Sequence, residues 1–238
     1  MLKNTAFQIP ATLKPPVERQ PFQVELVHEL PHLPVLPETL LLLELKVQET
    51  CVDLREISQL VLGDLGATLQ ILRLAGREYA NGDGRPVRIE DCISDLGLHA
   101  CLEAVSAQTL ARDGRRHAIA AAWSHSREIA QYAKLVAEDL PDVNPEEAYL
   151  VGLLHTTGLL PAILGWSRAE SAAADTALAG FRIANRWALP LCVVEFFCEI
   201  HLPGYGTRWS RIVQTAHQVA NRSSIHCPFE HDIRPHLQ

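Results

Sequence analysis

An apolar run at residues 149–160, broken by one polar triplet at residues 155–157, constrains the fold more than any other stretch of this sequence. Its apolar side chains recur near the i, i+3 and i+4 spacing of a helix face, so the segment is predicted to be helical and to lie against a core. His155 would then be carried inward. A histidine in that position is either a ligand or a buried side chain held by hydrogen bonds. The apolar positions are Leu150, Leu153, Leu154 and Leu160.

Helical patterns with local start signals occur before this run. Pro37 suits the first turn of one helix, and Asp53 is placed to cap a second. A third helix is expected at residues 67–75, closed by Gly76, and another at residues 89–96.

The pattern of apolar residues, glycines and prolines in the rest of the sequence predicts the fold class and the order of the regions. A loop is expected at residues 81–84, and Gly97 is expected to introduce a longer helix that runs through Leu110. Strand alternation of useful length is absent from the sequence, so we predict an all-α fold. The predicted regions are an extended, proline-containing arm at residues 1–29, an N-terminal helical lobe at 30–113, a second helical lobe at 114–223 and a tail at 224–238.

The boundary between the two lobes is placed near Gly114, inside a polar run at residues 112–117. We interpret this run as a solvated turn between helices, since charged runs usually face water. Its three arginines are alternatively a grip for an anionic ligand.

Charge and composition exclude several classes of protein. A net charge of -7 over 238 residues argues against broad nucleic-acid binding, which draws on cationic neutralisation of phosphates, and leaves only a local anion site open. The N-terminus lacks the apolar core of a signal peptide, and no uncharged apolar run reaches the roughly 18 residues of a membrane span. The six cysteines form no CxxC pair, so we interpret them as buried thiols of a cytoplasmic protein.

Residues 148–155 resemble the helix that carries the His-Asp pair of HD-superfamily metal phosphohydrolases, but Thr156 stands where the aspartate is expected. The first half of the chain resembles the N-terminal lobe of HDOD, the HD-related output domain of bacterial signalling proteins. The resemblance covers residues 30–223 and implies an HD-like helical bundle with an N-terminal helical lobe. The matching segments are residues 30–37, 53–57, 72–75, 85–89, 96–98, 187–190, 200–203 and 216–220.

The same resemblance locates the vestiges of an ancestral metal site. His125 falls at the place of the first HD-type histidine, and His155 and Thr156 stand for the His-Asp pair. His217 occupies the position of a further aspartate. His201 is the retained member of an element in which two histidines are common.

Two interpretations of these histidines are open. Three imidazoles and a water make a workable zinc site, and a zinc-bound water could attack a phosphoester. Alternatively, His125 and His155 lie in a neutral core and hydrogen-bond to hydroxyls such as those of Ser126, Thr156 or Thr157. Loss of both aspartates removes charge neutralisation for a metal pair and the base that orients water. We therefore predict no catalysis, no bound metal and no cofactor.

The predicted function is a non-catalytic signal-transduction output module that relays a bacterial regulatory signal by binding a partner protein. Arg77, Arg115 and Arg116 are candidates for recognition. The alternatives are a divergent HD-type phosphohydrolase that acts on a nucleotide or cyclic dinucleotide, and a sensor that holds a nucleotide without cutting it. Neither a nucleic acid nor a membrane is expected as a partner, and the sequence predicts no particular oligomeric state.

Overall fold

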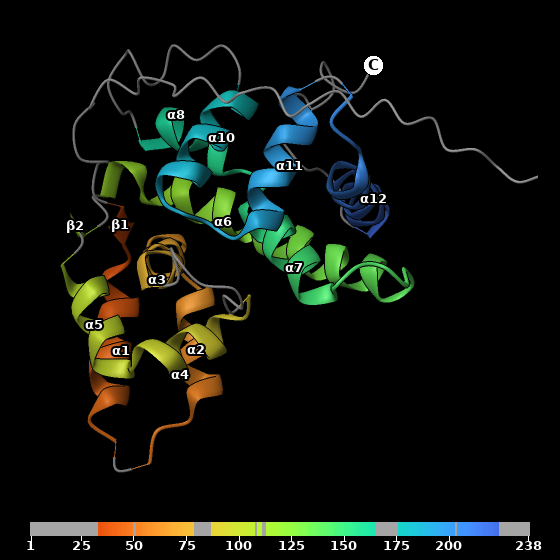
Figure 1. Cartoon of the computed structure of the whole chain (residues 1–238). Helices are drawn as coiled ribbons and strands as arrows, with labels where there is room; N and C mark the ends of the chain where they lie inside the picture. Colours follow the sequence, from red (N-terminus) through yellow and green to blue (C-terminus); the bar gives the residue numbers. More distant parts are fainter. Residues whose placement is uncertain are drawn as a thin grey trace, which may run out of the picture. The chain divides into compact units, whose positions relative to one another are not determined.

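The computed structural model describes residues 33–49, 51–78, 87–107, 109–110, 113–164, 176–202 and 204–223. Over these residues the fold is all-α, as predicted, apart from one pair of two-residue strands (Figure 1). The predicted arm at residues 1–29, the loop at residues 81–84 and the tail at residues 224–238 lie outside the described residues.

The first group of elements consists of short helices that pack against one another. α2 contacts α3 and α4, and α5 contacts α1, α3 and α4 (Figure 1). The elements are β1 Pro34–Val35, α1 Pro37–Val47, α2 Leu54–Leu62, α3 Leu65–Glu78, α4 Ile89–Leu96, α5 Leu98–Ser106 and β2 Thr109–Leu110.

Capping groups confirm two of the predicted helix starts. Pro37 is the first residue of α1, where a missing N–H costs nothing. Asp53 caps α2 by accepting a hydrogen bond from the backbone N–H two residues on, at 2.9 Å. Asp64 is 1% exposed and accepts hydrogen bonds from the backbone N–H groups of Leu36 at 2.7 Å and Ala67 at 3.1 Å. It therefore joins the entry of α1 to the start of α3.

The structure corrects two helix ends in this group. α3 does not close at Gly76 but continues to Glu78, because Gly76 is buried and packing outweighs the cost of an interior glycine, about 1 kcal/mol. The helix expected to reach Leu110 ends at Ser106 instead. Residues 109–110 pair in parallel with residues 34–35, a contact between distant parts of the chain that local periodicity does not encode.

In the second group, the long helix α6 packs against α7, α8 and α12 (Figure 1). α11 covers a further side by contacting α7, α10 and α12. The elements are α6 Asp113–Glu138, α7 Pro145–Leu154, the 3₁₀ helix η1 Thr157–Leu159, α8 Leu160–Leu164, α10 Thr176–Arg186, α11 Leu191–His201 and α12 Arg208–Ser223.

Within the polar run at residues 112–117, residues 113–117 are helical and do not form the turn that we expected. α6 begins at Asp113, so the predicted lobe boundary near Gly114 falls in the first turn of this helix. The alanine-rich sequence that follows then favours continuation of the helix.

The apolar run at residues 149–160 is buried as predicted but is not one continuous helix. α7 ends at Leu154, residues 155–156 form a turn, and η1 and α8 follow. The segment Pro145–Leu164 is long and apolar enough to cross a membrane by composition, yet most of it is buried inside the molecule. It is therefore a core segment, and His155, 6% exposed, lies at its bend.

Candidate functional site

Three buried histidines from three separate elements meet in the second group of helices. His125 belongs to α6, His155 follows the last residue of α7, and His217 belongs to α12. Their ring centroids lie 5.0–5.4 Å apart in every pairing. One ring nitrogen of each histidine lies within 4.8 Å of those of the other two. Among the described residues, no carboxylate or thiol belongs to this histidine cluster.

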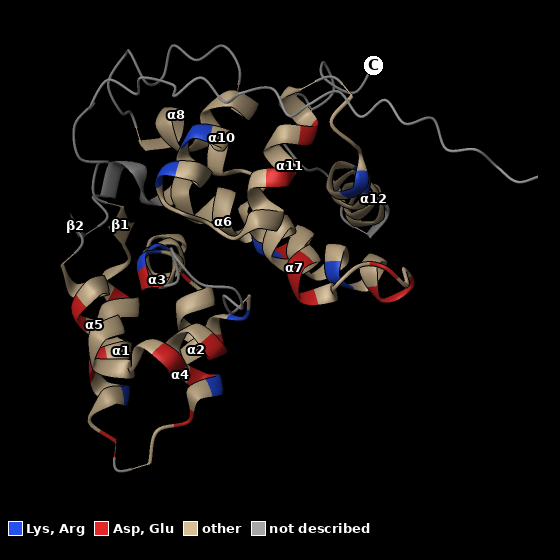
Figure 2. Cartoon of the chain, viewed as in Figure 1, with Lys and Arg blue, Asp and Glu red and all other residues tan. Residues whose placement is uncertain are grey.

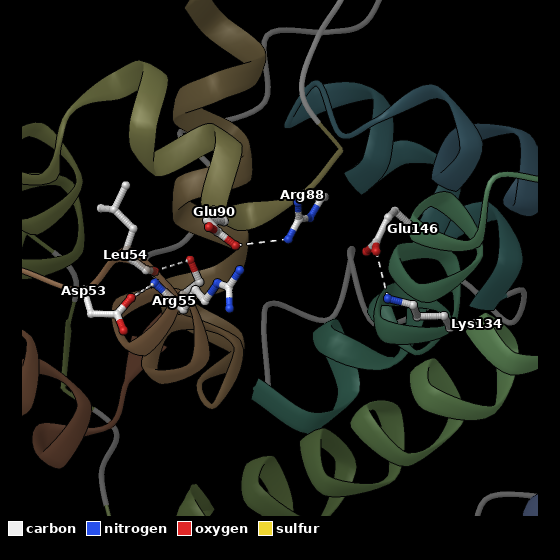
Figure 3. A network of polar contacts seen from close by, with 8 residues as sticks. Asp53, Leu54, Arg55, Arg88, Glu90, Lys134 and Glu146 are labelled. Atoms are coloured by element: carbon white, nitrogen blue, oxygen red, sulfur yellow. Dashed lines mark hydrogen bonds and ion pairs between the residues drawn. The ribbon is translucent and has the colours of Figure 1, made fainter.

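Close packing of α6 on α7 brings the first two imidazoles together. A Cβ atom on Gly152 would lie 2.8 Å from the Cα of Ala130, so only glycine permits this separation of the two backbones. His125 and His155 lie within two turns of this crossing on their respective segments. An ion pair between Lys134 Nζ and Glu146 Oε1, 2.8 Å long, joins the same two helices nearer the surface (Figure 3).

A backbone carbonyl fixes the tautomer of His155. Its Nδ1 lies 2.6 Å from the carbonyl oxygen of Gly152, and because a carbonyl can only accept, Nδ1–H is the donor. The lone pair of the ring is consequently on Nε2, which is buried and lacks a hydrogen-bond partner among the described residues. The Nε2 of His217 is buried and unpartnered in the same sense.

The hydroxyl groups near the histidine cluster bond to each other. Ser126 Oγ and Thr156 Oγ1 are 2.7 Å apart, and both side chains are buried. We predicted that hydroxyls of this kind would bond to His155, and for that residue the prediction is wrong, since its Nδ1–H donates to a carbonyl. Thr157 Oγ1 is buried without a partner among the described residues.

Burial keeps the imidazoles neutral at physiological pH. It holds the pKa of His155 well below the usual value, and the neighbouring His217 and His125 lower that pKa further. Burial, with a smaller contribution from His125, lowers the pKa of His217 to about 4. The pKa of His125 is also lowered by burial, against an opposing effect of Glu128. The cluster therefore consists of three neutral imidazoles that face one another.

The other predicted residues are not part of the histidine cluster. His201 is the last residue of α11 and is half-buried, so the structure assembles three of the four histidines that we expected to converge. Arg77 is exposed near the end of α3. Arg115 and Arg116 lie early in α6, and their side chains are outside the described residues.

Sequence reasoning missed the residue that orients the cluster. Because Gly152 has no side chain, α6 can pack closely against α7 at this position. The backbone carbonyl of Gly152 also accepts the hydrogen bond from His155 Nδ1–H. Its only sequence signal is a glycine three residues before the histidine inside an apolar helix, where glycine costs about 1 kcal/mol relative to alanine. Within the described part of the chain, the arrangement offers nitrogen ligands suited to late transition metals and none of the carboxylate oxygens that Mg²⁺ or Ca²⁺ prefers.

Comparison with known proteins identifies one family and one closely shared fold. A family model described as HDOD domain matches residues 33–169. A crystal structure of the MmoQ response regulator from Methylococcus capsulatus str. Bath, fragment 20-298, has a TM-score of 0.61 at 23% identity and covers 83% of this chain and 87% of that one. A second MmoQ structure has a TM-score of 0.60 at 22% identity, over 79% and 85% of the two chains.

A HDOD domain protein with unknown function from Geobacter sulfurreducens is also similar, at 23% identity over 83% of this chain and 77% of that one, with a TM-score of 0.34. No curated protein matches the chain. The MmoQ structures establish that the all-α fold described above is one already observed in crystals.

Proposed function

Since this chain belongs to the HDOD family, we propose that it is a non-catalytic signal-transduction output module that relays a bacterial regulatory signal by binding a partner protein. The similar MmoQ protein is named a response regulator, and the shared fold supports a signalling role for this chain. We propose that the partner protein binds to the helical surface, and that the buried interior serves to stabilise the fold.

The observation that carries the proposal is the chemistry of the buried centre. Where metal phosphohydrolases would present an aspartate after the histidine, Thr156 is bonded to Ser126. At the second aspartate position stands His217, whose imidazole is neutral. Among the residues that the structure describes, the histidine cluster therefore has no carboxylate to act as a general base or to balance the charge of a metal pair. Such a centre supports packing and ligand binding better than hydrolysis.

The surface of the first helical group supports recognition of a protein. Leu41 and Leu45, one turn apart on α1, are 57% and 54% exposed, and Leu42 between them is 43% exposed. An exposed apolar stripe of this kind usually marks a contact with another protein. Lys and Arg are interspersed with Asp and Glu on the described helices (Figure 2), which favours a protein over a nucleic acid as the partner.

Capture of the partner tests this proposal. We would immobilise the untagged chain and expose it to an extract of the cells that produce it. Binding of any retained protein would then be confirmed by calorimetry with both components purified. Wild type is expected to retain a specific protein, and Leu41→Ser/Leu45→Ser is expected to lose at least about 90% of it, which corresponds to 1.4 kcal/mol or more of binding energy.

Leu135→Ser is the matched control, because Leu135 is a helical leucine on α6 with a similar exposure of 55%. Its binding should equal that of the wild type. Failure to retain a specific protein, or equal retention by the α1 variant and the wild type, would count against a partner-binding role for α1.

A further inference from the structure

We propose that His125, His155 and His217 together bind one late transition-metal ion of the Zn²⁺ class through their imidazole nitrogens. This inference goes beyond the proposed function and does not depend on it. It replaces our expectation from the sequence that the chain binds no metal. The metal would hold three elements together: α6, the end of α7, and α12.

The positions of the ring nitrogens support a single shared ion. All three candidate ligand atoms lie within 4.8 Å of one another. In a tetrahedral zinc site with Zn–N bonds of about 2.0–2.1 Å, two nitrogen ligands are about 3.4 Å apart. The three nitrogens would therefore move closer together when the ion binds. Three histidine ligands also leave the fourth position of a tetrahedral site to a small exogenous ligand.

The hydrogen bonding of His155 is that of a ligand held ready for a metal. Histidine ligands in proteins almost always donate the second ring N–H to a carbonyl or carboxylate, which fixes the tautomer and the ring orientation. His155 Nδ1–H donates to the Gly152 carbonyl at 2.6 Å, and this leaves the lone pair of Nε2 free to bind. Without a metal, the buried Nε2 atoms of His155 and His217 have no partner among the described residues. Buried polar atoms rarely stay unsatisfied, so these two point to a ligand.

The donor set predicts which metals would bind. Neutral imidazoles suit Zn²⁺, Co²⁺, Ni²⁺ and Cu²⁺, whereas Mg²⁺ and Ca²⁺ require oxygen ligands. The hydroxyls of Ser126 and Thr156, which follow His125 and His155 in the sequence, are hydrogen-bonded to each other. His217 lies beyond the matched residues 33–169, so the third ligand comes from a part of the chain that the family match does not include.

The test uses full-length chain without an affinity tag, stripped with a chelator and then loaded with Co²⁺ or Zn²⁺. We expect one tightly held ion per chain by mass spectrometry and an intense visible Co²⁺ spectrum typical of a four-coordinate site. Saturating Zn²⁺ should raise the melting temperature by about 5–10 °C, whereas Mg²⁺ should leave it unchanged. A weak, octahedral-type Co²⁺ spectrum, or no retained ion, would overturn the proposal.

Variants locate the ion. His217→Gln and His125→Gln should each lower the affinity for Zn²⁺ at least about 100-fold and remove the Co²⁺ spectrum. His201→Gln, at a histidine outside the cluster, should keep both. A chain with His226, His231 and His236 of the tail replaced by Asn should also keep both, and loss of binding in that chain would assign the ion to the tail instead.

Discussion

Ser126 Oγ and Thr156 Oγ1 lie 2.7 Å apart in the interior, and Thr156 stands where the resemblance to metal phosphohydrolases would have placed a metal-binding aspartate. Two neutral hydroxyls can satisfy each other and leave no charge to balance. This neutral, hydrogen-bonded pair accounts for the burial of Thr156, the residue that follows His155.

The stability losses on removing the two hydroxyls should not be additive. Ser126→Ala and Thr156→Val each leave a buried hydroxyl without its partner, so each is expected to lower the free energy of unfolding by about 1–3 kcal/mol. The double variant should lose less than the sum of the two, with a coupling energy of about 1 kcal/mol. Urea unfolding of the four proteins measures this cycle. Simple additivity would mean that the two hydroxyls do not interact.

Substitution of Gly152 should separate α6 from α7. In Gly152→Ala, the new Cβ would lie 2.8 Å from Ala130 Cα, and backbone atoms cannot yield as a flexible side chain can. We expect a loss of about 3 kcal/mol or more in the free energy of unfolding.

Gly63→Ala is the comparison for Gly152→Ala. Its added Cβ would meet the carbonyl oxygens of Leu60 at 3.0 Å and Gln59 at 3.4 Å, both in the last turn of the preceding helix α2, and no atom of another helix is among its nearest contacts. The melting temperature of Gly152→Ala should therefore be well below that of Gly63→Ala in thermal unfolding. The reverse order would show that the contact between α6 and α7 is not as tight as described.

The start of α12 depends on one carboxylate. Glu199, on α11, accepts hydrogen bonds from the backbone N–H groups of Trp209 at 3.1 Å and Ser210 at 2.7 Å. A carboxylate is well suited to the positive end of a helix, so Glu199→Gln should lower the free energy of unfolding by about 1–2 kcal/mol. Hydrogen exchange should show faster opening of the first turn of α12. Glu103→Gln, at an exposed glutamate of α5, is the control and should leave exchange in α12 unchanged.

Cysteine reactivity should follow burial. Burial raises the pKa of the Cys101 thiol to about 11 and that of Cys192 to about 12. Cys51 is exposed, so our interpretation of the cysteines as buried thiols is wrong for this residue. Only the thiolate is alkylated, and a raised thiol pKa means that little thiolate forms until the pH approaches that value. At pH 8, iodoacetamide should modify Cys51 readily and Cys101 and Cys192 only after unfolding. Mass spectrometry of the digested protein gives the extent at each site, and rapid labelling of Cys192 in the folded chain would contradict its burial.

Local signals were sufficient for several elements and failed where distant segments meet. Pro37, Asp53 and the helix at residues 89–96 could be predicted because capping and periodicity act within one or two turns. The parallel pairing of residues 34–35 with residues 109–110 could not, because it joins segments far apart in the sequence. The continuation of α3 through Gly76 likewise reflects packing in the core.

The candidate site was predicted in part. The family resemblance selected His125, His155 and His217, which the structure brings together, and it also selected His201, which is not in the cluster. The bond from His155 to the Gly152 carbonyl depends on where α7 ends and how the chain bends there. Helical periodicity treats residues 149–160 as uninterrupted, so it could not indicate that bend.

An assay of phosphoester hydrolysis tests the central claim most directly. That claim is that the histidine cluster, which lacks carboxylates among the described residues, does not catalyse phosphoester cleavage. The untagged chain would be incubated with bis(p-nitrophenyl) phosphate and with cyclic dinucleotides, each in the presence of Mg²⁺, Mn²⁺ or Zn²⁺, beside His155→Ala as the matched blank. We predict product formation by the wild type no faster than by His155→Ala under every condition. Metal-dependent turnover by the wild type that is absent from His155→Ala would contradict the account.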